Sequence, residues 1–380
     1  MATLSQSQQL LAKTMDDFVT NEITPRLEAI ETTRCIPVDL IAKLGKQGLL
    51  GSLVAMEYGG QAVDYLSYGL IHKAIGGVSH SVRSLLTVHD MVALAIETYG
   101  STTQKKIWLP SLATGQQLAA FALSERQAGN NYQEITTTLE PHSHGFYLNG
   151  CKTWISCADL ADLWLVFAKW NNQPVALLVP KTLPGIQIKS IDGITATPAA
   201  RLNHLTFQKV ELTEDHILGP IGMGLHLVAN TALTLGRYSI AWSNVGLLRS
   251  CYLASLAFSQ QHCVNQQPLF NYQLTQQKLT NLLVQFKAAR SLALEAGDAL
   301  QQRKNSAIGA VMLAKYFSSQ QATQAVLDTI QIHGAVGFQQ NQRFHQWLLD
   351  AKLTEVIEGS TEIQQLQIAQ LYQSITLIDE

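Results

Sequence analysis

The chain has 380 residues, of which 47% are hydrophobic and 14% charged, and its net charge is −2 at pH 7. This length allows two or three domains with substantial cores, and a charge near zero argues against partners such as nucleic acids or anionic membranes. The five cysteines are scattered without a C-x-x-C pair, which argues against a disulfide framework or zinc site and favours a reducing compartment.

The first part of the chain, residues 1–118, is predicted to form an N-terminal all-α domain. Apolar residues recur at helical spacing in Leu10-Leu11-Met15-Phe18-Val19 and again in Leu40-Ile41-Leu44. Glycines between Leu44 and Gly51 are predicted to end a helix. Further helices are expected at residues 81–99 and 103–113.

Residues 119–221 are predicted to form a middle β-domain. Short aliphatic and aromatic runs bounded by Gly, Asn or Pro occur at residues 119–123, 145–150, 163–168 and 175–179. This pattern is typical of the strands of an antiparallel sheet. The pattern continues at residues 205–207.

Residues 222–380 are predicted to form a C-terminal α-helical bundle. Long amphipathic segments are expected near residues 223–260, 273–302, 306–333 and 345–372, with a turn at 334–337. Helices, then strands, then helices define an α+β chain with segregated elements. No signal peptide or membrane-spanning run is evident, so we expect a cytoplasmic protein.

Near the C-terminus, Val356-Ile357 precedes a lone carboxylate, Glu358, and a glycine. Apolar neighbours should raise the pKa of this carboxyl, which suits a general base for a C–H proton. Thr361 and Gln364 have the spacing of a capping box. The alternative is that Glu358 only favours the dipole of the next helix.

The predicted β-domain contains two segments suited to a flat polar cofactor. The loop from Phe121 to Asn130 offers backbone N–H groups and short polar side chains. Trp154 and Ser156 are two residues apart and should share one face of a strand. Considered alone, the loop could be an ordinary turn and Trp154 a core residue.

Other polar residues have ordinary alternatives. Arg237, inside a predicted helix, could reach a buried anion or a thioester pocket, or form a surface salt bridge. The glycines at Gly334 and Gly337 could approach a phosphate or cap a helix. His89 and His333 are predicted to be core or interface residues, and no set of residues has the spacing of a metal site.

Together these segments resemble the acyl-CoA dehydrogenase family of flavoproteins along nearly the whole chain. The segments that carry the resemblance fall in one order: Leu49-Leu-Gly51, Glu57-Tyr-Gly-Gly60, Tyr99-Gly100, Gln104–Pro110, Phe121-Ala-Leu-Ser-Glu125, Leu148–Lys152, Trp154-Ile-Ser156, Gly236-Arg237, Gln331-Ile-His-Gly334, Asp350-Ala-Lys352 and Glu358–Gln364.

The resemblance implies a fold with an N-terminal helical domain, a middle antiparallel β-domain and a C-terminal four-helix bundle. It implies FAD as cofactor, a homo-oligomeric dimer or tetramer in which a neighbouring subunit completes the site, and Glu358 as the catalytic base. The cofactor-binding residues that it implies are Phe121, Leu123, Ser124, Gly129, Trp154, Ser156, Phe270, Gln331, Gly334, Ala335, Ser360 and Glu362. The substrate-binding residues are Asn130, Asn131, Arg237 and Gly359.

The chain departs from the family pattern at the edges of the expected site. Gln267-Pro-Leu-Phe-Asn271 stands where the family usually has Arg-x-x-Phe-Gly, so one cation for the FAD pyrophosphate is missing. Ile357 replaces a tyrosine, Ala335 a glycine, and Leu349 an arginine. Asn130-Asn131 replaces Ser-Asp in the flavin loop. These changes affect the cofactor and substrate edges and leave the base in place.

The resemblance implies that Glu358 removes the α-proton of a thioester-linked acyl group while a hydride passes to the flavin. The chain is similar to dehydrogenases of polyketide extender-unit pathways in three segments, Ser81–Val88, Gly236–Trp242 and Glu355–Ser360. Those enzymes oxidise a small hydroxy- or aminoacyl group on an acyl carrier protein, as in methoxymalonyl or aminomalonyl formation.

Two alternatives stay open at this point. The substrate could be an ordinary short-chain acyl-CoA, with an electron-transfer flavoprotein or, as in an oxidase, oxygen as electron acceptor. The chain could also be a non-catalytic scaffold that binds a carrier protein, since the cofactor residues are altered.

Overall fold

The computed structural model describes residues 4–373, and these divide into two compact units. Unit 1 contains the N-terminal segment to Pro25, Tyr65–Arg83 and the chain from Arg237 onward. Unit 2 contains Arg26–Asp64 and Ser84–Gly236. The three domain boundaries expected from the sequence stay a prediction.

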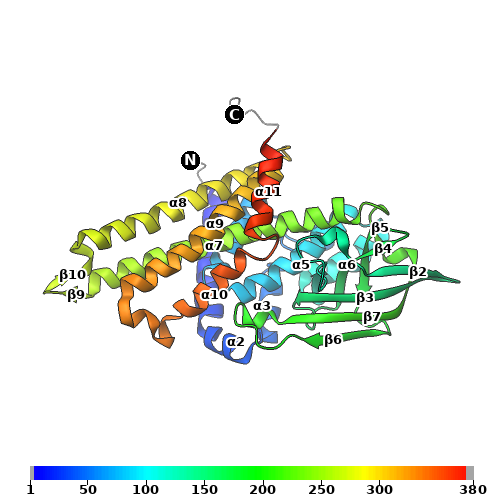
Figure 1. Cartoon of the computed structure of the whole chain (residues 1–380), viewed down its shortest axis with the longest axis horizontal. Coiled ribbons are helices and arrows are strands. Elements are labelled where there is room, and N and C mark those ends of the chain that lie inside the picture. Colours follow the sequence, from blue (N-terminus) through cyan, green and yellow to red (C-terminus); the bar gives the residue numbers. More distant parts are fainter. Residues whose placement is uncertain (1–3, 374–380) are drawn as a thin grey trace. The chain divides into compact units, whose positions relative to one another are not determined.

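Unit 2 contains an eight-stranded sheet and several helices (Figure 1). Its helices are α2 (Leu27–Thr33), α3 (Val38–Lys46), most of α5 (His80–Tyr99) and α6 (Thr102–Thr114). Its strands are β1 (Ala119–Ala122), β2 (Thr138–His142), β3 (Gly145–Ser156), β4 (Leu163–Trp170), β5 (Gln173–Pro180), β6 (Ile186–Ser190), β7 (Leu202–Leu212) and β8 (Ile217–Leu218).

The sheet has the strand order β6-β7-β3-β2-β4-β5-β8, with β1 beside β4. Most pairs are antiparallel, as predicted, but β1 is parallel to β4 and β2 also meets β4 in parallel at Thr138 and Lys169. The sheet is therefore mixed, with the antiparallel pairs in the majority. The forty residues between β1 and β4 are long enough for the crossover that a parallel pair requires.

Strand β4 is buried on both faces because its apolar residues are continuous. Leu163, Leu165 and Phe167 belong to a core that includes residues of α5 and α6. Trp164 and Val166 point to a second core, formed with β3 and β7. A run such as Leu-Trp-Leu-Val-Phe-Ala is typical of a strand covered on both sides.

Strands β2 and β6 are among those that the sequence pattern did not predict. Strand β2 contains Glu140 and Pro141, and strand β6 is mostly exposed, so neither shows an apolar run. Their positions are fixed by pairing with β3 and β7. Strand β3 also runs without a break through the two segments that the sequence separated.

Unit 1 is helical. Its elements include α1 (Gln6–Phe18), α4 (Tyr65–Gly76), most of α7 (Asn230–Gln261), α8 (Gln273–Gln301), α9 (Ala307–His333), α10 (Phe344–Thr354) and α11 (Thr361–Tyr372). Helices α8, α10 and α11 each pack against α9 (Figure 1). Small residues such as Ala314, Ser318 and Ala322 lie on the buried side of α9, which allows close helix contacts.

The helices of the C-terminal part follow the predicted ranges, with two differences. The single helix expected at residues 345–372 is two helices, α10 and α11, separated by the segment that contains Glu358. The helix expected from residue 223 begins with a π-helical turn, Gly224–Ala229. The turn at Gly334–Phe338 is a short 3₁₀ helix.

Two histidines are core residues, as predicted. His89 accepts a hydrogen bond from the Ala119 N–H at 3.2 Å, and its other ring nitrogen lies 3.0 Å from the Leu112 carbonyl. His333 lies 2.7 Å from the Thr329 carbonyl and stacks on Phe258. Burial lowers the pKa of both imidazoles, so both are neutral structural groups.

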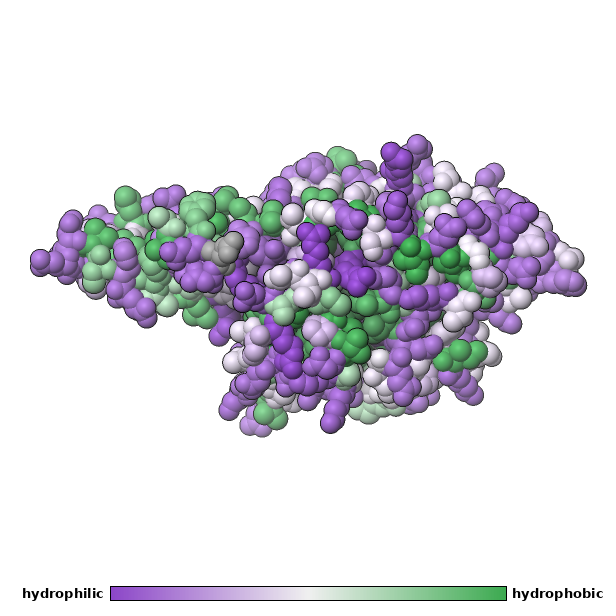
Figure 2. Space-filling model, turned by 90° about the horizontal axis from the view of Figure 1, so that it is seen from below, coloured by the Kyte–Doolittle hydropathy of each residue, from purple (hydrophilic) through white to green (hydrophobic). Residues whose placement is uncertain are grey.

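The surface of unit 1 carries hydrophobic residues. Leu274, Val284 and Leu366 are 75%, 59% and 62% exposed. Figure 2 shows hydrophobic side chains, in green, among hydrophilic ones on one face of the molecule. None of the described helices is both long and apolar enough to cross a membrane.

Candidate functional site

Glu358 lies in a tight turn between α10 and α11 in unit 1. Its backbone is left-handed, with φ 57°, and the next residue, Gly359, has φ 93°. Left-handed backbone is strained for a residue with a side chain. Such strain at a single polar residue is found most often at functional sites and requires strong support from its surroundings.

The predicted capping box at the start of α11 is wrong. The N-cap is Ser360, and its side chain does not cap the helix. The Thr361 hydroxyl and N–H both donate to the Glu355 carbonyl, and the Gln364 amide donates to the Glu358 carbonyl at 3.4 Å. These groups are therefore used to hold the turn in place.

Two buried cations hold the backbone carbonyls of this turn. Arg237 on α7 donates from Nε to the Glu358 carbonyl at 2.8 Å. Lys315 on α9 donates from Nζ to the Gly359 carbonyl, also at 2.8 Å. Arg237 is 3% exposed and Lys315 1%. The surface salt bridge considered for Arg237 is therefore wrong, because its guanidinium is buried beside Glu358.

The carboxyl of Glu358 is poorly solvated. Its Oε2 is buried and has no hydrogen-bond partner among the described residues. Burial raises the pKa of Glu358 to about 7, although Arg237, Arg83 and Lys315 act to lower it. A raised pKa was predicted, but for another reason: Val356 is 57% exposed and so does not desolvate the carboxyl.

In unit 2, the loop after β1 is held by a buried ion pair. Lys152 on β3 donates to Glu125 at 2.7 Å and to the Leu123 carbonyl at 3.2 Å. The N–H of Thr153 donates to the Ser124 carbonyl at 2.9 Å. The predicted flavin loop and the strand that carries Trp154 are thereby fixed to each other.

Glu125 accepts four further hydrogen bonds, from the N–H and hydroxyl groups of Thr136 and Thr137, at 2.6–3.1 Å. Burial acts to raise the pKa of Glu125, but Lys152 and these donors outweigh it and lower the pKa to about 2. Burial lowers the pKa of Lys152 to about 8, with Glu125 acting against this change. Both groups stay charged at neutral pH.

Trp154 is an exposed residue of β3, so the alternative of a core indole is wrong. It has φ 60° and lies in an irregularity of the pairing between β3 and β7, and 54% of its surface is exposed. Ile155 beside it is buried, while Ser156 is half-buried. The bulge turns the indole outward.

These features fit a flavin. An exposed flat ring with a nearby hydroxyl offers stacking and a hydrogen bond to a flat heterocycle. Gly129 in the loop has no heavy atom within 4 Å of the place that a side chain would occupy, so a ligand could approach its backbone closely.

The other predicted residues are placed as follows. Gln331 and Ala335 are exposed around the left-handed Gly334 at the end of α9. Phe270 is 37% exposed in a 3₁₀ turn after the hairpin of β9 (Cys263–Val264) and β10 (Gln267–Pro268). Asn130 and Asn131 are exposed in the loop, and Ser360 and Glu362 open α11. Phe121 contacts Phe167 with ring centroids 5.2 Å apart and the two rings tilted by 59°.

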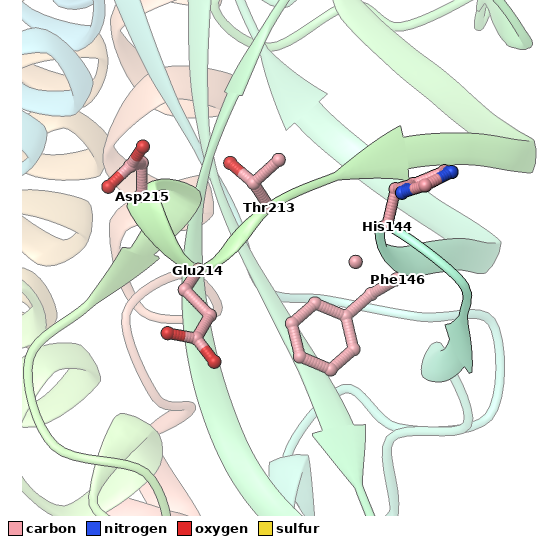
Figure 3. A pocket seen from close by; sticks show the side chains of 6 residues that line it. His144, Phe146, Thr213, Glu214 and Asp215 are labelled. Atoms are coloured by element: carbon pink, nitrogen blue, oxygen red, sulfur yellow. The ribbon is translucent and has the colours of Figure 1, made fainter.

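Two surface hollows are lined by other residues. One, of about 500 Å³, is lined by His144, Phe146 and Thr213–Asp215 in unit 2 (Figure 3). The other, of about 310 Å³, lies in unit 1 between η1 (Val19–Ile23), α4 and α7, with Lys73 and Arg249 in its wall. The side chains in Figure 3 do not converge on a common point, and neither hollow contains a predicted site residue.

Sequence reasoning missed Arg83, Lys315 and the Glu125–Lys152 pair as site residues. A lysine on a helix is usually exposed, but Lys315 follows Ala-Val-Met-Leu-Ala with no other charge nearby in the sequence. This apolar context was the available signal that Lys315 is buried.

Three family models match the chain in order. They describe the N-terminal domain of acyl-CoA dehydrogenase at residues 5–116, the middle domain at residues 120–210 and the C-terminal domain at residues 222–372. The chain therefore belongs to the acyl-CoA dehydrogenase family. It has the predicted fold of that family and is an FAD-dependent dehydrogenase. This membership favours the enzyme over the scaffold.

Individual relatives agree with this assignment. An acyl-CoA dehydrogenase of Bacillus subtilis is 32% identical over 372 residues, which cover 96% of this chain and 98% of the relative. The human mitochondrial short-chain specific acyl-CoA dehydrogenase is 30% identical over 96% of this chain and 90% of the relative.

Solved structures have the same fold. Butyryl-CoA dehydrogenase from Megasphaera elsdenii superimposes with a TM-score of 0.93 at 26% identity, covering 98% of this chain and 99% of that one. The prolyl acyl carrier protein oxidase AnaB has a TM-score of 0.93 at 23% identity over 98% of this chain and all of that one. At this identity the second likeness concerns the fold alone.

Proposed function

We propose that this dehydrogenase oxidises an acyl group held as a thioester, with Glu358 as the general base for the α-proton. The observation that carries this proposal is the buried Oε2 of Glu358, which has no hydrogen-bond partner among the described residues. A base works best when its pKa is near the working pH, and burial raises the pKa of Glu358 to about 7.

FAD, when bound, supplies the acceptor for the hydride that leaves the carbon next to the deprotonated one. Trp154 would cover the ring, and Ser156 and Ser124 would offer hydroxyls to its edge. Leu123 is held by Lys152, which keeps the loop in one conformation. Glu358 takes the α-proton, and its low solvation keeps water from competing for the carboxylate.

We propose a small hydroxyacyl group as substrate. Arg83 is buried, and its charge acts to lower the pKa of the Glu358 carboxyl. A guanidinium so placed favours an oxygen on the acyl group and disfavours the ammonium of an aminoacyl group. For a 3-hydroxyacyl thioester, the hydride leaves the carbinol carbon, and the product is the enol of a 3-oxoacyl thioester.

We also propose an acyl carrier protein as the carrier of this group. The support is the similarity of residues 81–88 and 236–242 to dehydrogenases of extender-unit pathways. A homo-oligomer and an electron-transfer flavoprotein as electron acceptor are part of the proposal. Peroxide release during turnover in air would instead assign oxygen as the acceptor.

The test uses propionyl and 3-hydroxypropionyl groups, each loaded on CoA and on an acyl carrier protein. Flavin bleaching is followed without oxygen in the wild-type holoenzyme and in Arg83→Met. We expect the highest kcat/KM for the 3-hydroxypropionyl group on the acyl carrier protein. This value should exceed those of the other three substrates by at least about tenfold, which corresponds to about 1.4 kcal/mol. In Arg83→Met the preference for the hydroxyl should fall. Equal or better use of propionyl-CoA would contradict the proposed substrate.

A further inference from the structure

Lys315 is a fully buried cation whose hydrogen bond goes to a neutral backbone group. It is 1% exposed on α9, and its Nζ donates to the Gly359 carbonyl at 2.8 Å. Among the described residues, no carboxylate oxygen forms an ion pair with it. Burying a charge costs several kcal/mol, so an unpaired buried lysine is uncommon.

The hydrogen bond of Lys315 acts on the conformation of Glu358. The carbonyls of Glu358 and Gly359 are consecutive along the chain, and each accepts a hydrogen bond from a buried cation on a different helix. Two fixed carbonyls define the peptide planes on both sides of Gly359. These bonds fix the left-handed backbone of Gly359 and the peptide plane that follows Glu358, and so they restrict the strained backbone of Glu358.

The charge of Lys315 acts on the carboxyl itself. A neutral donor could hold the Gly359 carbonyl equally well, so the hydrogen bond alone does not account for a lysine. Arg83, Arg237 and Lys315 all favour the ionised form of Glu358, while Glu355 and Glu362 also face Lys315. Burial lowers the pKa of Lys315 to about 7, with Glu358 acting against this change.

We propose that Lys315 is a positioning residue for the proposed base: its hydrogen bond fixes the Glu358–Gly359 turn, and its charge favours the carboxylate. The proposal rests on the proposed function only for the role of Glu358. Lys315 itself does not touch the substrate in this account.

The experiment compares Lys315→Met, which lacks donor and charge, with Lys315→Gln, which keeps a donor. Lys278→Met is the control, because this lysine on α8 pairs with Asp328 at 3.0 Å and is 37% exposed. Hydrogen exchange of residues 355–360 reports the turn. Infrared difference spectra against pH report the protonation of Glu358, whose band is identified by its loss in Glu358→Gln.

Lys315→Met is expected to speed exchange of residues 355–360 by about tenfold and to raise the midpoint of Glu358 protonation by about one pH unit. Lys315→Gln should raise the midpoint similarly but speed exchange less. The proposal is overturned if the hydrogen exchange of residues 355–360 and the midpoint of Glu358 protonation in Lys315→Met both equal those in Lys278→Met. If Lys315→Met does not fold, Lys315→Gln alone decides through the midpoint.

Neither readout requires turnover. A Glu358→Gln enzyme that still reduces its flavin would refute the base but leave the Lys315 result valid, so the two failures can be told apart.

Discussion

At the residue scale, two opposing effects set the ionisation of Glu358. Burial favours the protonated carboxyl, whereas Arg83, Arg237 and Lys315 favour the carboxylate. The same residue has a left-handed backbone, which is held by hydrogen bonds to its own carbonyl and to that of Gly359. Arg237 and Lys315 therefore hold the orientation of Glu358 and also moderate the basicity that burial gives it.

The raised pKa of Glu358 predicts how stability changes with pH. The carboxyl of Glu358 stays protonated up to about pH 7 in the folded state but only up to pH 4.5 in the unfolded chain. Its stabilising contribution to the free energy of unfolding is therefore complete below pH 4.5 and is lost as pH rises to about 7. Lys315 affects stability in a different pH range, because its pKa is lowered. Its contribution to the free energy of unfolding is complete above pH 10.5 and is lost as pH falls to about 7.

The measurement is urea unfolding of the wild type and of Glu358→Gln at a series of pH values. The free energy of unfolding of the variant, relative to the wild type, should increase as pH rises from 4.5 to about 7 and then level off. A difference that stays constant across this window would contradict the raised pKa.

At the element scale, the Glu125–Lys152 pair joins the loop after β1 to β3. Lys152 is inaccessible and Glu125 is 5% exposed, so removing one partner leaves a buried charge without its counterion. Lys152→Met is therefore expected to lower the free energy of unfolding by about 3–5 kcal/mol. It should also reduce FAD occupancy, because the loop would no longer be fixed to the strand that carries Trp154.

The matched control is Lys304→Met in the exposed Lys304–Asp298 pair, whose side chains are 48% and 54% exposed. Surface ion pairs contribute about 1 kcal/mol or less, so this variant should unfold almost as the wild type does. Equal effects of the two substitutions, measured by urea unfolding and by flavin absorbance per protein, would refute a supporting role for the buried pair.

At the scale of the whole molecule, most helices and strands could be predicted, because periodic apolar residues reveal which face is buried. Continuous apolar runs such as that of β4 also predict a strand, because both of its faces are buried. Strands β2 and β6 could not be predicted from their own side chains, because pairing with β3 and β7 defines them. The break between α10 and α11 was indicated by the motif at Glu358–Gln364, but the distant residues that hold its carbonyls were not.

The sequence predicted which residues form the candidate site, but not the residues and the bulge that hold them in position. The order of the motifs indicated Glu358, Trp154 and Ser156 together. The outward turn of Trp154 depends on a bulge that alternation alone does not reveal. Lys315 and Arg83 lie 43 and 275 residues before Glu358, and no local pattern connects them to it.

The most direct test of the account is anaerobic flavin reduction in Glu358→Gln with the thioester that reduces the wild type fastest. We expect the variant to bind FAD normally, with the flavin absorbance of the wild type, and to lose at least about 10³-fold in the rate of flavin bleaching, since the base for the α-proton is gone. A variant that bleaches its flavin at the wild-type rate would show that Glu358 is not the base.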